Sequence, residues 1–237
     1  VDYGPGEAVG APWHPHRGFE TVTYLLDGRM QHEDSAGNSG ELNPGDVQWM
    51  TAGRGIIHSE EPHDEFRRTG GRTHGFQIWV NLPAEHKMMA PRYQEIPSEE
   101  SPTVYQEGVW ARVIAGECMG QKSSISTIIP IKLIHVRMNP DSVLSQEIES
   151  DLNSMIYVFG GKIVIDNQLE VRDHPLPRGL GVSQQVRDGE LAVLSKGKKI
   201  KIRSDIDSEF LILAGPEIDE QVARYGPFVM NTWEEIN

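Results

Sequence analysis

Two short segments carry paired side chains of the types that bind metal ions. The first reads HPH over residues 14–16, and the second reads HSE over residues 58–60. In an extended strand, residues two apart point to the same face, and Pro15 biases His14 toward an extended backbone. Three imidazoles and one carboxylate that meet inside a small barrel would suit Fe, Ni, Cu, Mn or Zn, whereas Ca and Mg prefer more oxygen ligands.

A single histidine at either place would more often be an ordinary surface or hydrogen-bonded residue. The double pairing, with glycine-rich turns between the two segments, favours a metal site. We therefore expect one ion to be bound by His14, His16, His58 and Glu60. We expect structural roles for His32 and His74, and no site role for the histidines that lack a paired neighbour: His63, His86, His135 and His174.

The elements that must position these residues are predicted to be short strands joined by tight turns. The 24 glycines and 15 prolines are spread along the 237 residues, which favours an all-β fold. Asp27-Gly28 predicts a hairpin, and residues 74–83 form a clear strand of aromatic and β-branched residues. Residues 65–72 and 84–103 lack an apolar period and are predicted to be connectors. Trp49 and Trp79 are expected in the core or at its rim.

The pattern of strands repeats after about residue 124, which suggests duplication of a small barrel. Only the first copy has histidines at its key positions. We predict an N-terminal metal-binding barrel over residues 1–120 and a C-terminal barrel without metal ligands over residues 121–237, with short helical or irregular connectors. The matching stretches are TVTYLLDGRMQHED with NSMIYVFGGKIVID, LNPGDVQWMT with VRDGELAVLS, and THGFQIWVNLPA with DSEFLILAGPEI.

Composition narrows the classes of partner and compartment. With 22 Lys and Arg against 35 Asp and Glu, the net charge is -13, which disfavours direct contact with nucleic acid. The single cysteine, Cys118, is expected to be a small buried hydrophobe in a protein from a reducing compartment. No stretch approaches the roughly 18 apolar residues of a membrane helix, and no secretion signal precedes the first strand. We expect a cytoplasmic protein, or a nuclear one if the source is eukaryotic.

The two metal-type segments also resemble the cupin superfamily and, within it, the pirin family. The second cupin motif, G-x-x-H, is matched by Gly55 and His58, with Gly53 in place of the usual nearby proline. The resemblance continues through GFQIWVNLP, AGE and GPFVMNT, and so covers nearly the whole chain. Compared with the family, the sequence lacks an N-terminal strand segment and the last helix. The first cupin motif is matched by His14, His16, Glu20 and Gly28.

The resemblance implies a cupin-type fold for both barrels, and it bears on the carboxylate ligand. Many cupins take this ligand from the first motif, which makes Glu20 the rival of Glu60. Strand parity does not decide, because each glutamate lies an even number of residues from a histidine. The pirin pattern favours Glu60 and leaves Glu20 a supporting or structural role. It implies one divalent ion, with Fe²⁺ placed ahead of Ni, Cu, Mn and Zn.

The resemblance also implies a function. Pirin-like proteins are linked to flavonol (quercetin) 2,3-dioxygenase activity, in which O₂ opens the central ring and carbon monoxide is released. We expect such an enzyme, with a small aromatic substrate and with Glu60 as the catalytic group that accepts the flavonol proton.

The alternative is an iron- and redox-responsive transcriptional co-regulator that acts through a protein partner. Because the net charge is -13, that partner would be a basic protein or one already bound to DNA. A third reading is a metal-binding protein that acts on some other small acid or phenol.

Overall fold

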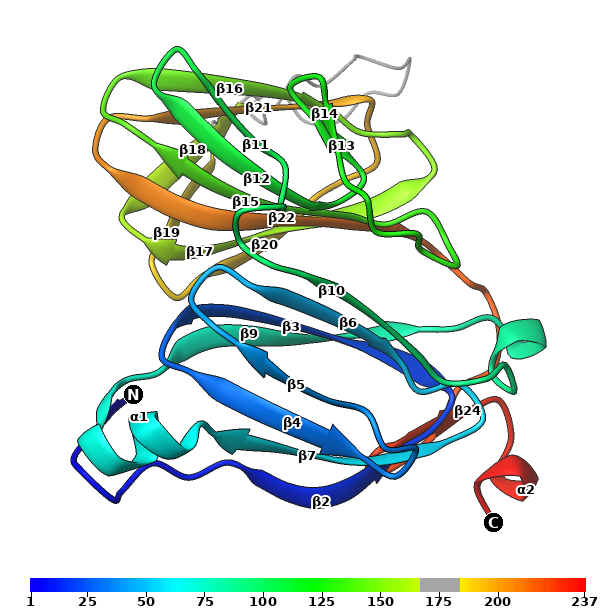
Figure 1. Ribbon diagram of the computed structural model, residues 1–237. Helices are drawn as coiled ribbons and strands as arrows, with labels where there is room; N and C mark the ends of the chain where they lie inside the picture. The colour runs from blue at the N-terminus through cyan, green and yellow to red at the C-terminus, as the bar shows by residue number, and fades with distance from the viewer. Residues whose placement is uncertain (167–183) are drawn as a thin grey trace. The chain divides into compact units, whose positions relative to one another are not determined.

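The computed structural model describes residues 1–166 and 184–237, which form β-strands joined by short connections and a few short helices (Figure 1). Two units are distinguished. Unit 1 comprises Val1–Ser101 and Ile218–Asn237, and unit 2 comprises Pro102–Glu217. In the described part of the chain, no helix has the length and apolarity needed to span a bilayer.

Unit 1 consists mainly of two four-stranded antiparallel sheets that form two layers (Figure 1). The main strands are β2 (Ala11–His16), β3 (Phe19–Asp27), β4 (Met30–Asp34), β5 (Ser39–Leu42), β6 (Val47–Thr51), β7 (Ile56–Pro62), β9 (His74–Asn81) and β10 (Arg92–Ile96). The sheet orders are β10-β6-β3-β9 and β2-β7-β4-β5. The smaller elements are β1 (Asp2–Tyr3), α1 (Asp64–Thr69), β8 (Gly71–Arg72) and the 3₁₀ helix Ala84–His86.

Unit 2 consists mainly of a six-stranded and a four-stranded antiparallel sheet. The strands are β11 (Thr103–Gln106), β12 (Val109–Ala115), β13 (Glu117–Cys118), β14 (Gln121–Lys122), β15 (Lys132–Met138), β16 (Ser142–Glu147), β17 (Leu152–Gly160), β18 (Lys162–Asp166), β19 (Gln184–Arg187), β20 (Leu191–Val193), β21 (Lys199–Ser204) and β22 (Ser208–Pro216). The orders are β11-β12-β15-β22-β17-β20 and β16-β21-β18-β19. Cys118 is buried here, as predicted, and burial raises its pKa to about 11.

Seven strands of the two units correspond in both chain order and pairing. The order β2-β7-β4-β5 matches β16-β21-β18-β19, and β6-β3-β9 matches β20-β17-β22. The sequence stretches that suggested a duplication fall on these matched strands. The prediction of an all-β fold made of two tandem cupin-type barrels is therefore confirmed.

The Asp27-Gly28 turn connects two sheets, so the predicted hairpin is wrong. Strand β3 pairs with β6 and β9, whereas β4 pairs with β5 and β7. Gly28 has φ 98°, a left-handed conformation that favours glycine, so the turn itself was correctly recognised. Turn chemistry allows the chain to reverse, but it does not select the strand with which the returning segment pairs.

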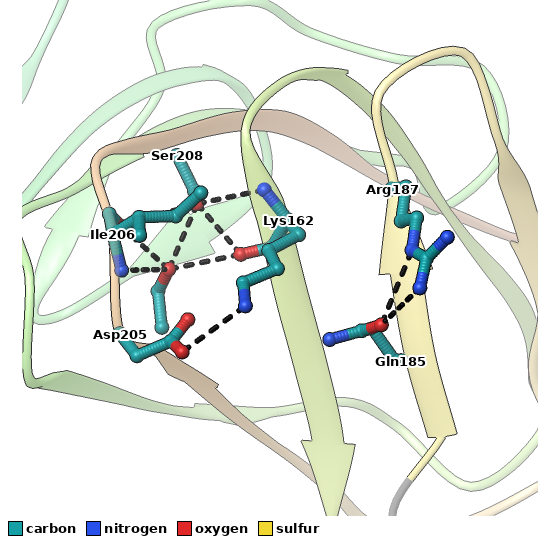
Figure 2. Close-up of polar contacts among 7 residues, drawn as sticks. Lys162, Gln185, Arg187, Asp205, Ile206 and Ser208 are labelled. Atoms are coloured by element: carbon teal, nitrogen blue, oxygen red, sulfur yellow. Dashed lines mark hydrogen bonds and ion pairs between the residues drawn. The ribbon is translucent and has the colours of Figure 1, made fainter.

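The matching turn in unit 2 behaves in the same way. Strand β17 pairs with β20 and β22, and β18 pairs with β19 and β21. After this turn, Lys162 is held at β22: the Ser208 hydroxyl donates to the Lys162 carbonyl at 2.7 Å, and Lys162 Nζ lies 3.1 Å from Asp205 Oδ2 (Figure 2). Each barrel therefore closes by passing the chain from one sheet to the other.

The boundary between the two units differs from the predicted one, which lay between residues 120 and 121. Unit 2 begins at Pro102 instead. Strand β11 pairs with β12, and β12 pairs with β15, so residues 102–120 belong to unit 2. Strand pairing between segments that are distant in sequence sets this division, and no local pattern reveals it.

The C-terminal segment belongs to unit 1. It contains β23 (Ala223–Tyr225), β24 (Phe228–Met230) and α2 (Trp233–Ile236). The backbone of Val229 donates to the Arg17 carbonyl at 3.0 Å. The buried Lys87 ammonium donates to the Val229 carbonyl at 2.9 Å and to the Gly18 carbonyl at 2.7 Å. A lysine from the middle of the chain thus joins the first barrel to the end of the sequence.

Two predicted connectors contain regular structure. Within residues 84–103, β10 pairs with β6 along five positions, and within residues 65–72 the helix α1 begins after His63, whose Nδ1 accepts from Glu65 N at 3.2 Å. Strand β10 lies at the edge of its sheet and lacks a strong apolar alternation, which is why the sequence pattern missed it.

Candidate metal centre

Three histidine side chains meet where strands β2 and β7 pair. In the antiparallel register His14 lies opposite His58, and His16 lies two residues further along β2. One ring nitrogen of each lies within 4.8 Å of the other two. His16 and His58 are buried and His14 is half-buried. The structure therefore brings together all three histidines that the sequence predicted.

The nitrogen positions fit joint coordination of one ion. Nε2 of His14 and Nε2 of His16 are 3.0 Å apart, which is about the separation of two ligands that lie roughly 2.1 Å from one ion at about 90°. His14 Nδ1 lies 2.7 Å from the Pro12 carbonyl, so that nitrogen carries the proton and Nε2 keeps its lone pair. Both ring nitrogens of His58 are buried without a hydrogen-bond partner among the described residues, and a bound cation would give a partner to one of them.

Burial keeps two of these imidazoles neutral. Burial, followed by the nearby His58 and His14, lowers the pKa of His16 to about 4. Burial and then His14 lower the pKa of His58, also to about 4. Imidazole binds a metal through the lone pair of its neutral form. At neutral pH both side chains therefore present a free lone pair, and no proton has to be displaced.

Glu60 lies beside the three histidines, and its carboxylate is held by two neighbouring side chains. Its Oε2 is 4.0 Å from Nε2 of His58. The Gln77 amide donates to Oε1 at 2.9 Å and to Oε2 at 2.7 Å, and the Thr23 hydroxyl donates to Oε1 at 3.1 Å. The fourth predicted ligand is thus next to the cluster, while the three histidines alone form the tight group.

Glu20, the rival carboxylate, contacts a different part of the barrel. It accepts from the Thr51 hydroxyl at 2.6 Å, and burial raises its pKa. His16 ends β2 and Glu20 follows the start of β3 in the other sheet, with Gly18 at φ 86° between them. Even spacing places residues on one face only within a single strand, so the parity count did not apply here.

Sequence reasoning missed Gln77 and Thr23. The two residues lie opposite each other where β9 pairs with β3, so strand register places both next to Glu60. Their separation of more than fifty residues in the sequence hides this relationship. The alternation along β9 was the signal available, because it puts Gln77 and Trp79 on one face.

An aromatic surface lies next to the histidines. The Trp79 ring is 5.8 Å from the His16 ring and 4.4 Å from the Phe19 ring, measured between centroids. Trp79 is 38% exposed, and the Arg224 guanidinium lies 5.0 Å from its ring centroid. Trp79 is thus at the rim and Trp49 is fully buried, which agrees with the prediction for both.

The other histidines mostly make structural contacts. His32 Nε2 lies 2.8 Å from Glu95 Oε1, which also accepts from Gln48 at 2.9 Å. His135 Nε2 lies 2.8 Å from Glu209 Oε1 in unit 2. His174 lies outside the described residues.

The family of the chain follows from comparison with known sequences. The family model described as Pirin matches residues 2–80, and the model described as Pirin C-terminal cupin domain matches residues 133–237. The protein named Pirin from Homo sapiens is 41% identical over 235 residues, which are 98% of this chain and 75% of that protein. The chain belongs to the pirin family. Another pirin-family relative, a pirin-like protein of Solanum lycopersicum, is 39% identical over 99% of this chain and 75% of its own length.

Solved structures of similar proteins share this fold. The structure of quercetin 2,3-dioxygenase from Acinetobacter baumannii is 33% identical, with a TM-score of 0.89 over 100% of this chain and 78% of that chain. The bacterial pirin YhhW from Escherichia coli, solved in complex with nickel(II), is 23% identical, with a TM-score of 0.65 over 90% of this chain and 78% of that chain. The second likeness concerns the fold alone.

Proposed function

We propose that this pirin-family chain is a metal-dependent flavonol 2,3-dioxygenase, which opens the central ring of quercetin-like substrates with O₂ and releases carbon monoxide. The observation that carries the proposal is the group of three buried or half-buried histidines with Glu60 beside it and an exposed tryptophan next to it. The similarity to a protein named quercetin 2,3-dioxygenase, at 33% identity over the whole chain, supports it.

One divalent ion would be held by His14, His16, His58 and Glu60. Fe²⁺ is our first choice, and Ni, Cu, Mn and Zn also accept three imidazoles and a carboxylate. When bound, the ion supplies the Lewis acidity and the redox chemistry that a reaction with O₂ needs. In unit 2, the buried residues of the matching strands β16 and β21 include no histidine and no carboxylate, and this unit is proposed to bind no metal.

Glu60 is proposed to accept the proton of the flavonol hydroxyl. Its carboxylate is nearly fully buried, with 6% of the residue exposed, and it stands 4.0 Å from the nearest histidine nitrogen. Gln77 and Thr23 donate to it and hold its oxygens in place. A positioned carboxylate of this kind can take a proton from a hydroxyl that comes within hydrogen-bond distance.

Trp79 is proposed to bind the flat substrate. Its partly exposed ring packs on Phe19 and lies close to His16, so a planar aromatic molecule stacked on it would reach toward the histidines. The Arg224 guanidinium beside this ring would attract the oxyanion that forms when the hydroxyl loses its proton.

The test combines metal analysis with a flavonol assay. Protein purified without added metal is analysed for its elements, loaded with each candidate ion, and mixed with quercetin in air and under nitrogen. We expect loss of the flavonol absorbance and release of carbon monoxide only with metal and O₂. Metal-loaded protein that leaves quercetin intact, but captures a basic protein in one oxidation state, would favour the co-regulator instead.

A further inference from the structure

We propose that Gln77 is the positioning residue for Glu60 and thereby sets the metal affinity of the centre. The inference rests on the proposed function in one respect, which is that it takes Glu60 as a ligand of the ion. Gln77 lies on strand β9, in the other sheet, and outside both cupin motifs.

The geometry gives the two carboxylate oxygens different surroundings. The Gln77 amide donates to both, at 2.9 Å to Oε1 and 2.7 Å to Oε2. The Thr23 hydroxyl donates to Oε1 alone, at 3.1 Å. Among the described residues, Oε1 therefore accepts two hydrogen bonds, whereas Oε2 accepts one and lies 4.0 Å from Nε2 of His58. The oxygen nearer to the histidines is the one that retains more lone-pair capacity for a cation.

The chemistry of an amide suits this task. Glutamine offers two N–H donors without a charge, so it orients the carboxylate and leaves its negative charge available to the metal. Lysine or arginine at this place would compete with the cation for Glu60, and an apolar side chain would let the carboxylate rotate. The partners are also fixed by the backbone, because Gln77 and Thr23 lie opposite each other in the β3–β9 pairing.

The test replaces Gln77 by an apolar side chain of similar length. In Gln77→Met we expect the affinity for Fe²⁺, measured anaerobically against a chromophoric chelator, to fall by roughly ten- to a hundred-fold. The visible absorption of the Co²⁺-loaded protein, which reports the ligands of the ion, should change as well. Because Gln77 is exposed on an edge strand, the substitution leaves no cavity, and thermal unfolding should confirm an intact fold.

A matched control comes from unit 2. Gln185 is also an exposed strand glutamine, and its side chain accepts hydrogen bonds from Arg187 at 3.1 Å and 2.9 Å (Figure 2). The change Gln185→Met removes the same chemical group far from any histidine of the centre in sequence. It should leave both the Fe²⁺ affinity and the Co²⁺ spectrum unaltered.

A double-mutant cycle separates positioning from a general structural role. If Gln77 acts through Glu60, Gln77→Met should weaken metal binding by less than two-fold when Glu60 is already alanine. An equal loss in both backgrounds would overturn the inference, as would unchanged affinity in Gln77→Met while Glu60→Ala weakens binding. A wild-type chain that binds none of the ions would overturn the proposed function together with the inference.

Discussion

The two units have matching strands but fill the space between their sheets with different side chains. In unit 1, strands β2 and β7 carry the three clustered histidines and Glu60. In unit 2, the buried residues of the matching strands β16 and β21 include no histidine and no carboxylate: they are Ser142, Leu144, Gln146, Ile200, Ile202 and Ser204. At these positions unit 1 thus has clustered histidines and a carboxylate, whereas unit 2 has aliphatic side chains beside small polar ones.

The remaining interior of each unit follows the same division. Unit 2 contains a cluster of buried apolar residues that extends from Val109 to Ala214 along the chain. Unit 1 contains many buried polar side chains: His16, Glu20, Thr21, Thr23, His32, Asp34, Gln48, Thr51, His58, Ser59 and Glu60. Buried polar groups need partners and contribute less to stability than apolar burial does. The two units thus share a strand order and differ in the polarity of their interiors.

The largest effect should come from removing His58 in unit 1, with His135 in unit 2 as the control. In His58→Ala we expect complete loss of bound metal and of flavonol consumption, because a central ligand is gone. In His135→Ala, which loses a buried contact with Glu209, the folded protein should still bind one ion per chain. Elemental analysis and the flavonol assay check both variants. Two ions in the wild-type chain, or undiminished turnover in metal-free His58→Ala, would break the comparison.

Truncation of the apolar core should destabilise unit 2 without affecting the metal. Ile212 is fully buried on β22, and Ile212→Ala should lower the free energy of unfolding by about 2–5 kcal/mol through lost burial and a cavity. Urea unfolding measures the stability, and metal titration of the folded protein should give the wild-type affinity. As a control, Ile206→Ala, at a residue that is 40% exposed, should cost far less.

Removal of the metal by a chelator should lower the stability of unit 1 and leave that of unit 2 unchanged. A ligand present at a hundred times its dissociation constant stabilises the form that binds it by about 2.7 kcal/mol. After metal removal, hydrogen exchange should therefore accelerate at the backbone amides of β7 and stay unchanged at those of β22. Equal acceleration in both strands would contradict the assignment of the metal to the first unit.

Lowering the pH should reduce the stability of metal-free unit 1 within a defined pH range. The pKa values of His16 and His58 are lowered to about 4 in the folded chain, against roughly 6.5 when unfolded. Between these values the unfolded chain binds more protons, so the free energy of unfolding should fall as the pH drops from about 6.5 to about 4. Replacing both histidines by asparagine should flatten this dependence, which thermal unfolding at a series of pH values can measure.

Unit 2 offers the contrasting case. Hydrogen bonds from His135 and Arg137 outweigh burial and lower the pKa of Glu209 to about 2. The stability that this carboxylate contributes is present above its unfolded pKa of about 4.3 and is lost only as the pH falls toward 2. Burial also lowers the pKa of His135, but this is one such histidine against two in unit 1. Unit 2 should therefore show a smaller decline than unit 1 between pH 6.5 and 4.

The sequence by itself determined the three histidines that cluster, the all-β class, the internal repeat and the resemblance to pirins. Each of these depends on residue types at short spacing or on similarity between aligned stretches. Tertiary structure alone decided that Asp27-Gly28 joins two sheets, that Glu20 faces Thr51, and that Gln77 holds Glu60. These outcomes depend on which strands pair and in which register, and pairing is settled by burial across the whole barrel.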